Sequence, residues 1–392
     1  MQLQLLGKYS RNFDSYQDTA INNPTHLLYN EYLQQEGYGS ATLVFRAIDQ
    51  FRRHLFLSLS SDEALCQLHS NLAQNNQVSR FVSQDVLAVS YRHSGFDMSA
   101  NILATWADEK TNSGLHHRYQ RLSPFVGLNL QSYSRSWTTD SGTFYRNLRL
   151  RYFFKENYRL PNFSEMYFFA MTRELKPERA LQNNLGLTYR SVTPTRWSHA
   201  PSLTHQATID CYFNRVSDKI VAIPQQNLFL WSMVNLGIVD ILGVDVTAEV
   251  SAGPISLSVN YSFARALDMT DSSSKVYRQQ IPYTPRHSGG LSATWRSRYG
   301  SLNYSLLWVG NRYSLGQNTA NNLVAGYVDQ DLTYTLHFLL HEGRLQSVVN
   351  AQQRGLWTLQ AKVLNLFNEQ YEVVKSYPMM GRSFRLSLSY HF

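Results

Sequence analysis

The last ten residues of this chain, 383–392, alternate strictly between apolar and polar side chains. Successive side chains of a β-strand point to opposite faces, so this segment has one apolar, aromatic face and one polar face. The apolar face is formed by Phe384, Leu386, Leu388, Tyr390 and Phe392. A length of about ten residues also matches what a tilted strand needs to cross a bilayer. The segment therefore predicts a strand that is half apolar and long enough to span a membrane.

The same alternation recurs along the chain, most clearly in a hairpin over residues 243–264. Within each arm of this hairpin the apolar residues share one parity and the polar residues share the other. The arms are separated by Ser251-Ala252-Gly253-Pro254, and Gly and Pro favour a tight turn. Similar segments give about sixteen strands of the length that a tilted membrane strand requires. An all-β, antiparallel fold follows.

Short connections alternate with long polar ones. The short ones lie near residues 49–53, 92–95, 251–254 and 297–300, and middle-length ones near 131–143, 191–202 and 340–355. The long ones lie near 11–40, 61–83, 155–180, 214–241, 265–287 and 366–382. This alternation is typical of an outer-membrane barrel, with long loops outside the cell and short turns in the periplasm. We therefore predict a transmembrane β-barrel of the cell outer membrane.

Composition agrees with a barrel. Charged residues make up 16% of the chain, against roughly 25% in soluble domains, and aromatic residues make up 13%, with 25 Tyr. Amphipathic rings suit the girdles of a lipid-facing barrel, although a soluble Tyr-rich β-protein that binds glycans has a similar composition. The formal charge of +8 is spread along the chain, which argues against nucleic acid as a partner. Cys66 and Cys211 form no metal or redox motif.

The terminal strand resembles the C-terminal assembly signal of bacterial outer-membrane barrels. This resemblance implies outer-membrane lipid and the barrel-assembly machinery as partners. The residues before it resemble the ending of TonB-dependent outer-membrane receptors, in which an Asn-Leu-Phe-Asn and a nearby Tyr precede a Pro and a Gly-Arg. The matching residues here are Asn365, Leu366, Phe367, Asn368, Tyr371, Gly381 and Arg382, with Pro378 between them. Asn tolerates turn conformations and Gly frees the backbone, so we expect these residues to shape a loop.

A second stretch, residues 157–178, resembles the aromatic-Arg-x-Pro, Glu-x-Tyr and Leu-Lys-Pro-Glu elements of the same family. The matching residues are Arg159, Pro161, Glu165, Tyr167, Leu175, Lys176, Pro177 and Glu178. Weaker similarity covers residues 213–220 and 281–286. The resemblance extends over roughly residues 140–392, while the earlier part of the chain is similar only in style.

Members of this family carry a plug domain inside a barrel of roughly 22 strands. The resemblance implies that residues 1–392 are one partial barrel domain, with about six strands, the plug and the signal peptide missing. Residues 1–9 already alternate like a strand and lack the pattern of a secretory signal. TonB is implied as a partner only if missing sequence supplies a plug, and we expect the fragment alone to be inactive. An exposed first strand would also leave unpaired backbone groups in lipid.

No catalytic chemistry is predicted. The chain shows no nucleophile motif, phosphate-binding loop or Cys/His cluster, so we expect no enzyme, no metal site and no cofactor. His116 and His117 are adjacent on a predicted strand and would point to opposite faces. Haem receptors of the family resemble one another in a His that follows the Arg-x-Pro element, and no His lies between Pro161 and Lys176.

Several charged residues fall on the polar face of predicted strands and would line the lumen. They are Arg149, Arg151, Asp245, Glu249 and Arg385. The loops rich in Tyr and Gln, such as residues 225–231, are candidates for contact with a siderophore, a corrinoid or a glycan, and the small-molecule ligand stays unknown. The predicted function is uptake of a scarce nutrient by a TonB-dependent receptor. A passive porin of sixteen strands and a soluble glycan-binding β-protein are the alternatives.

Overall fold

The computed structural model describes residues 1–392 except 18–28, 72–76, 141, 168–173, 198–199, 225–230, 298, 342–343, 348–355 and 392. The described chain is almost entirely β-strand, with a short helix α1 (Phe163–Tyr167) and a 3-10 turn η1 (Ala320–Asn322). No helix within these described residues is long and apolar enough to cross a membrane. The chain divides into two compact units. Unit 1 comprises residues 1–130, 152–183 and 214–239, and unit 2 comprises residues 131–151, 184–213 and 240–392.

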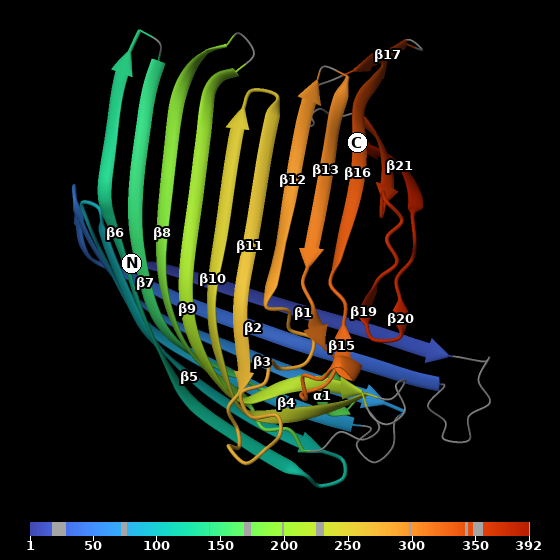
Figure 1. Ribbon diagram of the computed structural model, residues 1–392. Helices are drawn as coiled ribbons and strands as arrows, with labels where there is room; N and C mark the ends of the chain where they lie inside the picture. The colour runs from blue at the N-terminus through green and yellow to red at the C-terminus, as the bar shows by residue number, and fades with distance from the viewer. Residues whose placement is uncertain are drawn as a thin grey trace. The chain divides into compact units, whose positions relative to one another are not determined.

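Unit 1 begins with long antiparallel strands, each hydrogen-bonded to the next. They are β1 (Gln2–Gln17), β2 (Tyr29–Gln50), β3 (Arg53–Ser70), β4 (Gln77–His93), β5 (Phe96–Thr111) and β6 (His116–Thr139). Figure 1 shows β1 to β4 running side by side. The pairing of β2 with β3 shifts by one residue between Arg46 and Ile48, which is a β-bulge.

Five strands contribute residues to both units. They are β6, β7 (Gly142–Arg159), β8 (Glu178–Trp197), β9 (Ala200–Pro224) and β10 (Trp231–Ala252).

Unit 2 continues with β11 (Ile255–Asp268), β12 (His287–Ser297), β13 (Gly300–Val309), β16 (Tyr327–His341), β18 (Leu356–Leu364) and β21 (Ser383–His391). Each is antiparallel to the next, and Figure 1 shows β11 to β13 and β16 side by side. Two short ribbons lie in the connections: β14 (Arg312–Tyr313) with β15 (Leu323–Val324), and β19 (Glu372–Val374) with β20 (Tyr377–Pro378).

The predicted number of strands is confirmed. The main sheet holds 17 strands. However, β17 (Arg344–Ser347) and β18 pair with neighbouring stretches of the same strand β16, so these two occupy one position in the sheet. The antiparallel, all-β architecture follows from the alternation in the sequence, because each strand exposes one apolar face and needs neighbours for its backbone groups.

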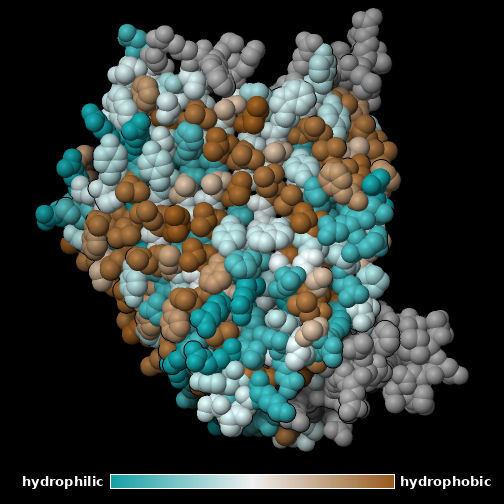
Figure 2. Space-filling model, viewed as in Figure 1, coloured by the Kyte–Doolittle hydropathy of each residue, from teal (hydrophilic) through white to brown (hydrophobic). Residues whose placement is uncertain are grey.

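The register places the apolar parities on one face. Leu291 pairs with Leu306, and Trp295 pairs with Leu302, so their side chains share a face of the β12–β13 pair. Trp295 is 53% exposed, and hydrophobic side chains gather widely on the surface that Figure 2 shows. An apolar surface of this extent is unfavourable in water and favourable in lipid.

The terminal segment forms a strand, β21, as its alternating sequence predicts. In β21 Phe384, Leu386 and Leu388 are 77%, 73% and 58% exposed, and Tyr390 lies against the ring of Trp357 with 4.8 Å between ring centroids. Phe392 lies outside the described residues.

Several predicted loops are wrong, because the strands continue through them. Most of the expected middle-length connection at 131–143 belongs to β6 and β7, and β8 and β9 occupy most of 191–202. Strands β1 to β4, β9 and β10 likewise extend far into the expected loops 11–40, 61–83 and 214–241. Where both faces of a strand are polar the alternation disappears, although the backbone ladder continues unchanged.

Candidate functional site

A buried ion pair joins the polar face of β4 to that of β5 in unit 1. Arg80 and Glu109 are directly opposite in the register, and their side chains are only 8% and 0% exposed. The Arg80 guanidinium also donates to the carbonyl of Pro161 at 2.7 Å and lies over the ring of Phe163 at 4.8 Å. The hydroxyl of Tyr167 donates to the second oxygen of Glu109 at 2.6 Å. The pair therefore anchors the segment that contains Pro161 and Tyr167, two of the predicted motif residues.

The motif segment after β7 is held by carboxylates. Arg159 donates to both oxygens of Glu165 at 3.0 and 2.9 Å and to Glu178 at 3.3 Å. Asn162 and Glu165 exchange hydrogen bonds between side chain and backbone, which is a capping box at the start of α1. Glu178 also accepts the backbone N–H of Ile220 at 3.0 Å, so Arg159, Glu165 and Glu178 tie the segment to β9.

The remaining motif residues complete this anchorage. Leu175 is 3% exposed, Pro177 is half-buried, and the Lys176 side chain is exposed. The backbone of Lys176 is held by Asn235, whose side chain accepts from its N–H at 2.9 Å and donates to its carbonyl at 3.0 Å. Asn235 donates also to the carbonyl of Asp218, a residue with a φ of 54°.

A second charged group lies on the polar face of unit 1. Arg121 and Arg179 both donate to the buried carboxylate of Glu156, at 2.6 Å and at 3.0 Å. The group carries one positive charge in excess. Two buried hydroxyls close to it in the register, those of Thr105 and Ser123, have no hydrogen-bond partner in the described structure.

The predicted polar-face charges of unit 2 have different surroundings. Arg151 donates to both oxygens of Asp210 at 3.1 Å, across Gly186, where a Cβ would lie 2.2 Å from Asp210 Oδ1. Asp245 accepts the hydroxyl of Ser262 at 2.6 Å.

Arg149, Glu249 and Arg385 are exposed, and Arg385 is directly opposite Lys362 in the register. The structure therefore pairs Arg151 with Asp210 and does not bring the five predicted charges together.

The C-terminal motif forms a compact loop base between β18 and β21. The backbone N–H of Asn365 donates to the side chain of Asp331 on β16 at 3.0 Å. Its side chain bridges the loop by donating to the carbonyl of Glu369 and accepting the N–H of the same residue. The side chain of Asn368 accepts the N–H of Arg382 at 2.8 Å.

The backbone conformations of the Asn residues agree with the expectation that Asn adopts a turn conformation. The expectation that Gly381 supplies backbone freedom is wrong. Asn365 and Asn368 have φ of 50° and 57°, the left-handed region that Asn tolerates. Gly381 is not among the described glycines with positive φ; instead, a Cβ there would lie 2.5 Å from Asn368 Oδ1. At Gly381 it is the space beside the Asn368 side chain, and not the backbone conformation, that favours glycine. Leu366 donates from its backbone to Gln330, and Phe367 is 66% exposed.

Tyr371 packs inside the same loop base. Its ring stacks on Tyr327 with centroids 4.1 Å apart, and its hydroxyl donates to Asp329 at 3.0 Å. Burial, and then the hydrogen bond to the Asp329 carboxylate, raises the pKa of Tyr371 to about 12. Arg312 lies over the Tyr327 ring at 5.4 Å and donates to the carbonyl of Val373 at 3.0 Å.

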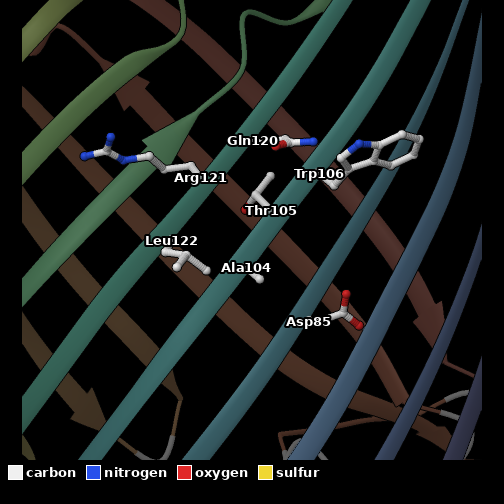
Figure 3. A pocket seen from close by; sticks show the side chains of 7 residues that line it. All are labelled: Asp85, Ala104, Thr105, Trp106, Gln120, Arg121 and Leu122. Carbon is white, nitrogen blue, oxygen red and sulfur yellow. The ribbon is translucent and has the colours of Figure 1, made fainter.

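The described surface carries several recesses, and the two described below lie one in each unit. A recess of 820 Å³ in unit 2 is lined by Gln280, Arg286, His287, Trp308, Gly310, Asn311, Tyr313, Leu323, Gly326, Tyr327, Val328 and Glu369. The other, of 650 Å³, lies among β4, β5 and β6 in unit 1. Figure 3 shows its lining, with Trp106 and Arg121 pointing away from one another, because they sit on opposite faces of the strands. This second recess borders the apolar face, where Asp85, opposite Ala104, is an exposed carboxylate.

The adjacent histidines are separated as expected. His116 contacts Asp108 at 2.8 Å, whereas His117 contacts Glu174 at 3.4 Å. Among the described residues no group of three or more His, Cys, Asp or Glu is placed to hold a metal ion.

Sequence reasoning missed Arg80, Glu109, Glu156 and Arg179. Arg80 and Glu109 are 29 positions apart, and only the strand register brings them together. In the sequence, the one indication of this pair is that each residue is a charged residue near the loop end of its strand, on the side of the strand opposite the exposed apolar side chains. The ligand-contact candidates at 225–230 lie outside the described residues.

The chain shares its fold with several solved structures, among them three transporters. The chain matches the FrpB iron transporter from Neisseria meningitidis (F5-1 variant, apoprotein form) at 13% identity with a TM-score of 0.67, over 99% of this chain and 61% of that one. It matches the copper transporter OprC at 13% identity and 0.65, over 97% and 61%. It matches the ferric citrate transporter FecA, unliganded, at 11% and 0.63, over 98% and 58%. The chain thus spans about 60% of the length of these proteins.

The family comparison covers almost the whole chain. The model of the family described as "TonB dependent receptor-like, beta-barrel" matches residues 2–366. That range contains all strands from β1 to β18, the motif segments up to Leu366, and the charged groups around Arg80, Glu156 and Arg151. The chain belongs to the TonB-dependent receptor β-barrel family.

Proposed function

We propose that this chain is the barrel portion of a receptor that takes up a scarce nutrient across the outer membrane, such as siderophore-bound iron or a corrinoid. The family is one of outer-membrane receptors and transporters, not enzymes. The named relatives carry iron, copper and ferric citrate, and this supports a nutrient bound as a metal or metal chelate. Residues 1–392 act in this proposal as one barrel domain, inserted by the barrel-assembly machinery.

The observation that carries the proposal is the double anchorage of the loop bases. In unit 1 the segment 159–178 is tied to β4, β5 and β9 through Arg80, Glu109 and Glu178. In unit 2 the segment 365–382 is tied to β16 through Asp331 and Asp329. Loops held by buried, charge-assisted hydrogen bonds keep a fixed shape, which a receptor needs for selective binding.

We further propose that these 392 residues alone do not drive energised uptake. The support is that the chain spans only about 60% of the length of the transporters it matches. In this proposal TonB is a partner only when a plug is supplied with the barrel. The loop residues that bind the nutrient are to be identified by experiment.

The test compares uptake and conductance. The chain, exported behind a signal peptide, is expressed in a Gram-negative strain that lacks its own ferric-siderophore receptors, and growth on ferric siderophores or a corrinoid is measured. We expect no growth from the chain alone, and growth when plug and remaining barrel strands are joined to it. Energised uptake by the chain alone would disprove the inactivity. A stable open pore of fixed size in planar bilayers would favour the passive porin instead.

A further inference from the structure

The recess of 820 Å³ in unit 2 lies at one particular end of its strands. Its residues are found at the start of β12, the end of β13 and the start of β16. These ends carry the long connections 269–286 and 310–326, whereas at the opposite ends only two residues separate β10 from β11 and β12 from β13. Long connections of outer-membrane barrels lie outside the cell, so this recess is at the outer rim of the barrel.

The recess opens on the lipid-contacting face. His287 is opposite Phe263, and Trp308 is opposite Gly289 and Val328. Further along the same strands this face continues with the pair Leu291 and Leu306. The recess therefore lies where the apolar face meets the outer leaflet.

An aromatic floor underlies one side of the recess: His287 and Trp308 belong to its lining, and Tyr261 packs against both of them from outside the lining. The rings of Tyr261, His287 and Trp308 stack on one another, with centroids 6.2 to 6.4 Å apart and interplanar angles of 12° to 29°. The hydroxyl of Tyr261 and Nδ1 of His287 share a hydrogen bond of 2.8 Å, which leaves Nε2 of the imidazole for a further partner. Amphipathic rings at this depth are the usual contact surface for lipid headgroups and the upper parts of acyl chains.

A cation without a protein partner stands beside this floor. Arg286 is exposed, and its guanidinium makes no hydrogen bond or ion pair with the described residues. The acidic residue in the recess, Glu369, is occupied by the backbone N–H of Val328, at 3.2 and 3.3 Å from its two oxygens. A free guanidinium fits phosphate with two parallel hydrogen bonds.

We propose that this recess binds the phosphate-bearing headgroup of an outer-leaflet glycolipid. Arg286 holds the phosphate, His287 donates to it from Nε2, and Trp308, backed by Tyr261, packs against the sugar and the upper acyl chains. Lipid is favoured over a soluble anion, because the aromatic floor continues into the apolar face. The site rests on placement of the barrel in the outer membrane and is independent of which nutrient is transported.

The test measures binding of lipid A, a phosphorylated glycolipid, to the full chain folded in detergent micelles, by native mass spectrometry. Dephosphorylated lipid A and inorganic phosphate are the comparison probes. We expect lipid A to bind at least tenfold more tightly than its dephosphorylated form, and Arg286→Gln to weaken its binding about tenfold. Millimolar inorganic phosphate is expected to leave lipid A bound.

Variants separate the site from general effects on folding. Arg296→Gln removes an exposed arginine from the opposite end of β12 and is expected to leave lipid binding unchanged. Trp308→Leu is expected to weaken binding of both lipid forms, and Arg286→Lys to retain part of the preference for phosphate. Folding of every variant is checked by the shift in electrophoretic mobility on heating. Equal binding of the two lipid forms, an unchanged affinity in folded Arg286→Gln, or displacement of lipid A by inorganic phosphate would each overturn the proposal.

Discussion

Two ion pairs between β4 and β5 differ in burial although they join the same strands. Arg80 and Glu109 are almost completely buried, whereas Arg92 and Asp97 are 68% and 40% exposed. Water screens the exposed pair, while the buried pair has exchanged its hydration for mutual contacts and for bonds to Pro161 and Tyr167. Two ion pairs on the same pair of strands therefore contribute very differently to the free energy of unfolding.

We predict that Glu109→Gln lowers the free energy of unfolding by about 3–5 kcal/mol, because it leaves the Arg80 charge buried without its partner. Asp97→Asn, the matched change at the other end of the same strand pair, is expected to lower it by less than about 1 kcal/mol. Urea unfolding of the chain folded in detergent measures both values. Equal losses in the two variants would contradict the assigned difference.

Tyr371 gives a prediction about alkaline pH. Its pKa is raised from 10.0 to about 12, so the folded state favours the neutral phenol that donates to Asp329. The resulting stabilisation is fully present below pH 10 and is lost as pH rises through about 12. We expect the tyrosinate absorbance of folded wild-type chain, minus that of Tyr371→Phe, to rise near pH 12. A difference curve centred near pH 10 would show that the hydroxyl is not held by the carboxylate.

At the scale of elements, β21 shows that pairing with a neighbouring strand does not cover the side chains of a lipid-facing strand. Phe384, Leu386 and Leu388 remain largely exposed although every residue of 383–391 is opposite a residue of β18. The ladder to β18 pairs the backbone along one edge of β21, and it does nothing to cover the apolar side chains, which need lipid.

Leu386→Arg is expected to destabilise the folded barrel in lipid vesicles by about 2–4 kcal/mol, because it places a charge on the lipid face near mid-strand. Ser387→Arg introduces the same charge one residue further along, on the polar face, and is expected to have a small effect. The fraction of folded chain, followed by the heat-dependent shift in mobility during urea titration, reports both. A larger loss in Ser387→Arg would mean that the two faces of β21 are assigned in reverse.

Elements also mark where sequence reasoning was sound and where it was not. The hairpin of β10 and β11 and the turn at Ser251–Pro254 follow from alternation and from Gly and Pro. The outer halves of β2, β3 and β4 could not be predicted from alternation, because both of their faces carry polar residues and the period-two pattern vanishes there.

At the scale of the whole molecule, the large exposed apolar surface predicts a requirement for lipid or detergent. We expect the chain to stay unfolded or aggregated in detergent-free buffer and to gain β-structure in micelles, as measured by far-ultraviolet circular dichroism and by mobility on heating. A folded monomer in buffer would instead support the soluble glycan-binding alternative.

The sequence by itself determined the all-β class, the number of strands, the apolar face of β21 and the family to which the motifs point. These depend on local parity and on short motifs, which a strand carries wherever it is placed. The partners of Arg80, the surroundings of Arg151 and the recess beside Arg286 were decided only by tertiary structure. Each joins residues far apart in the chain, and one step of register would move every one of them to the other face. The terminal strand could thus be read from its residues, whereas the charges that hold the loops in place required the register of the sheet.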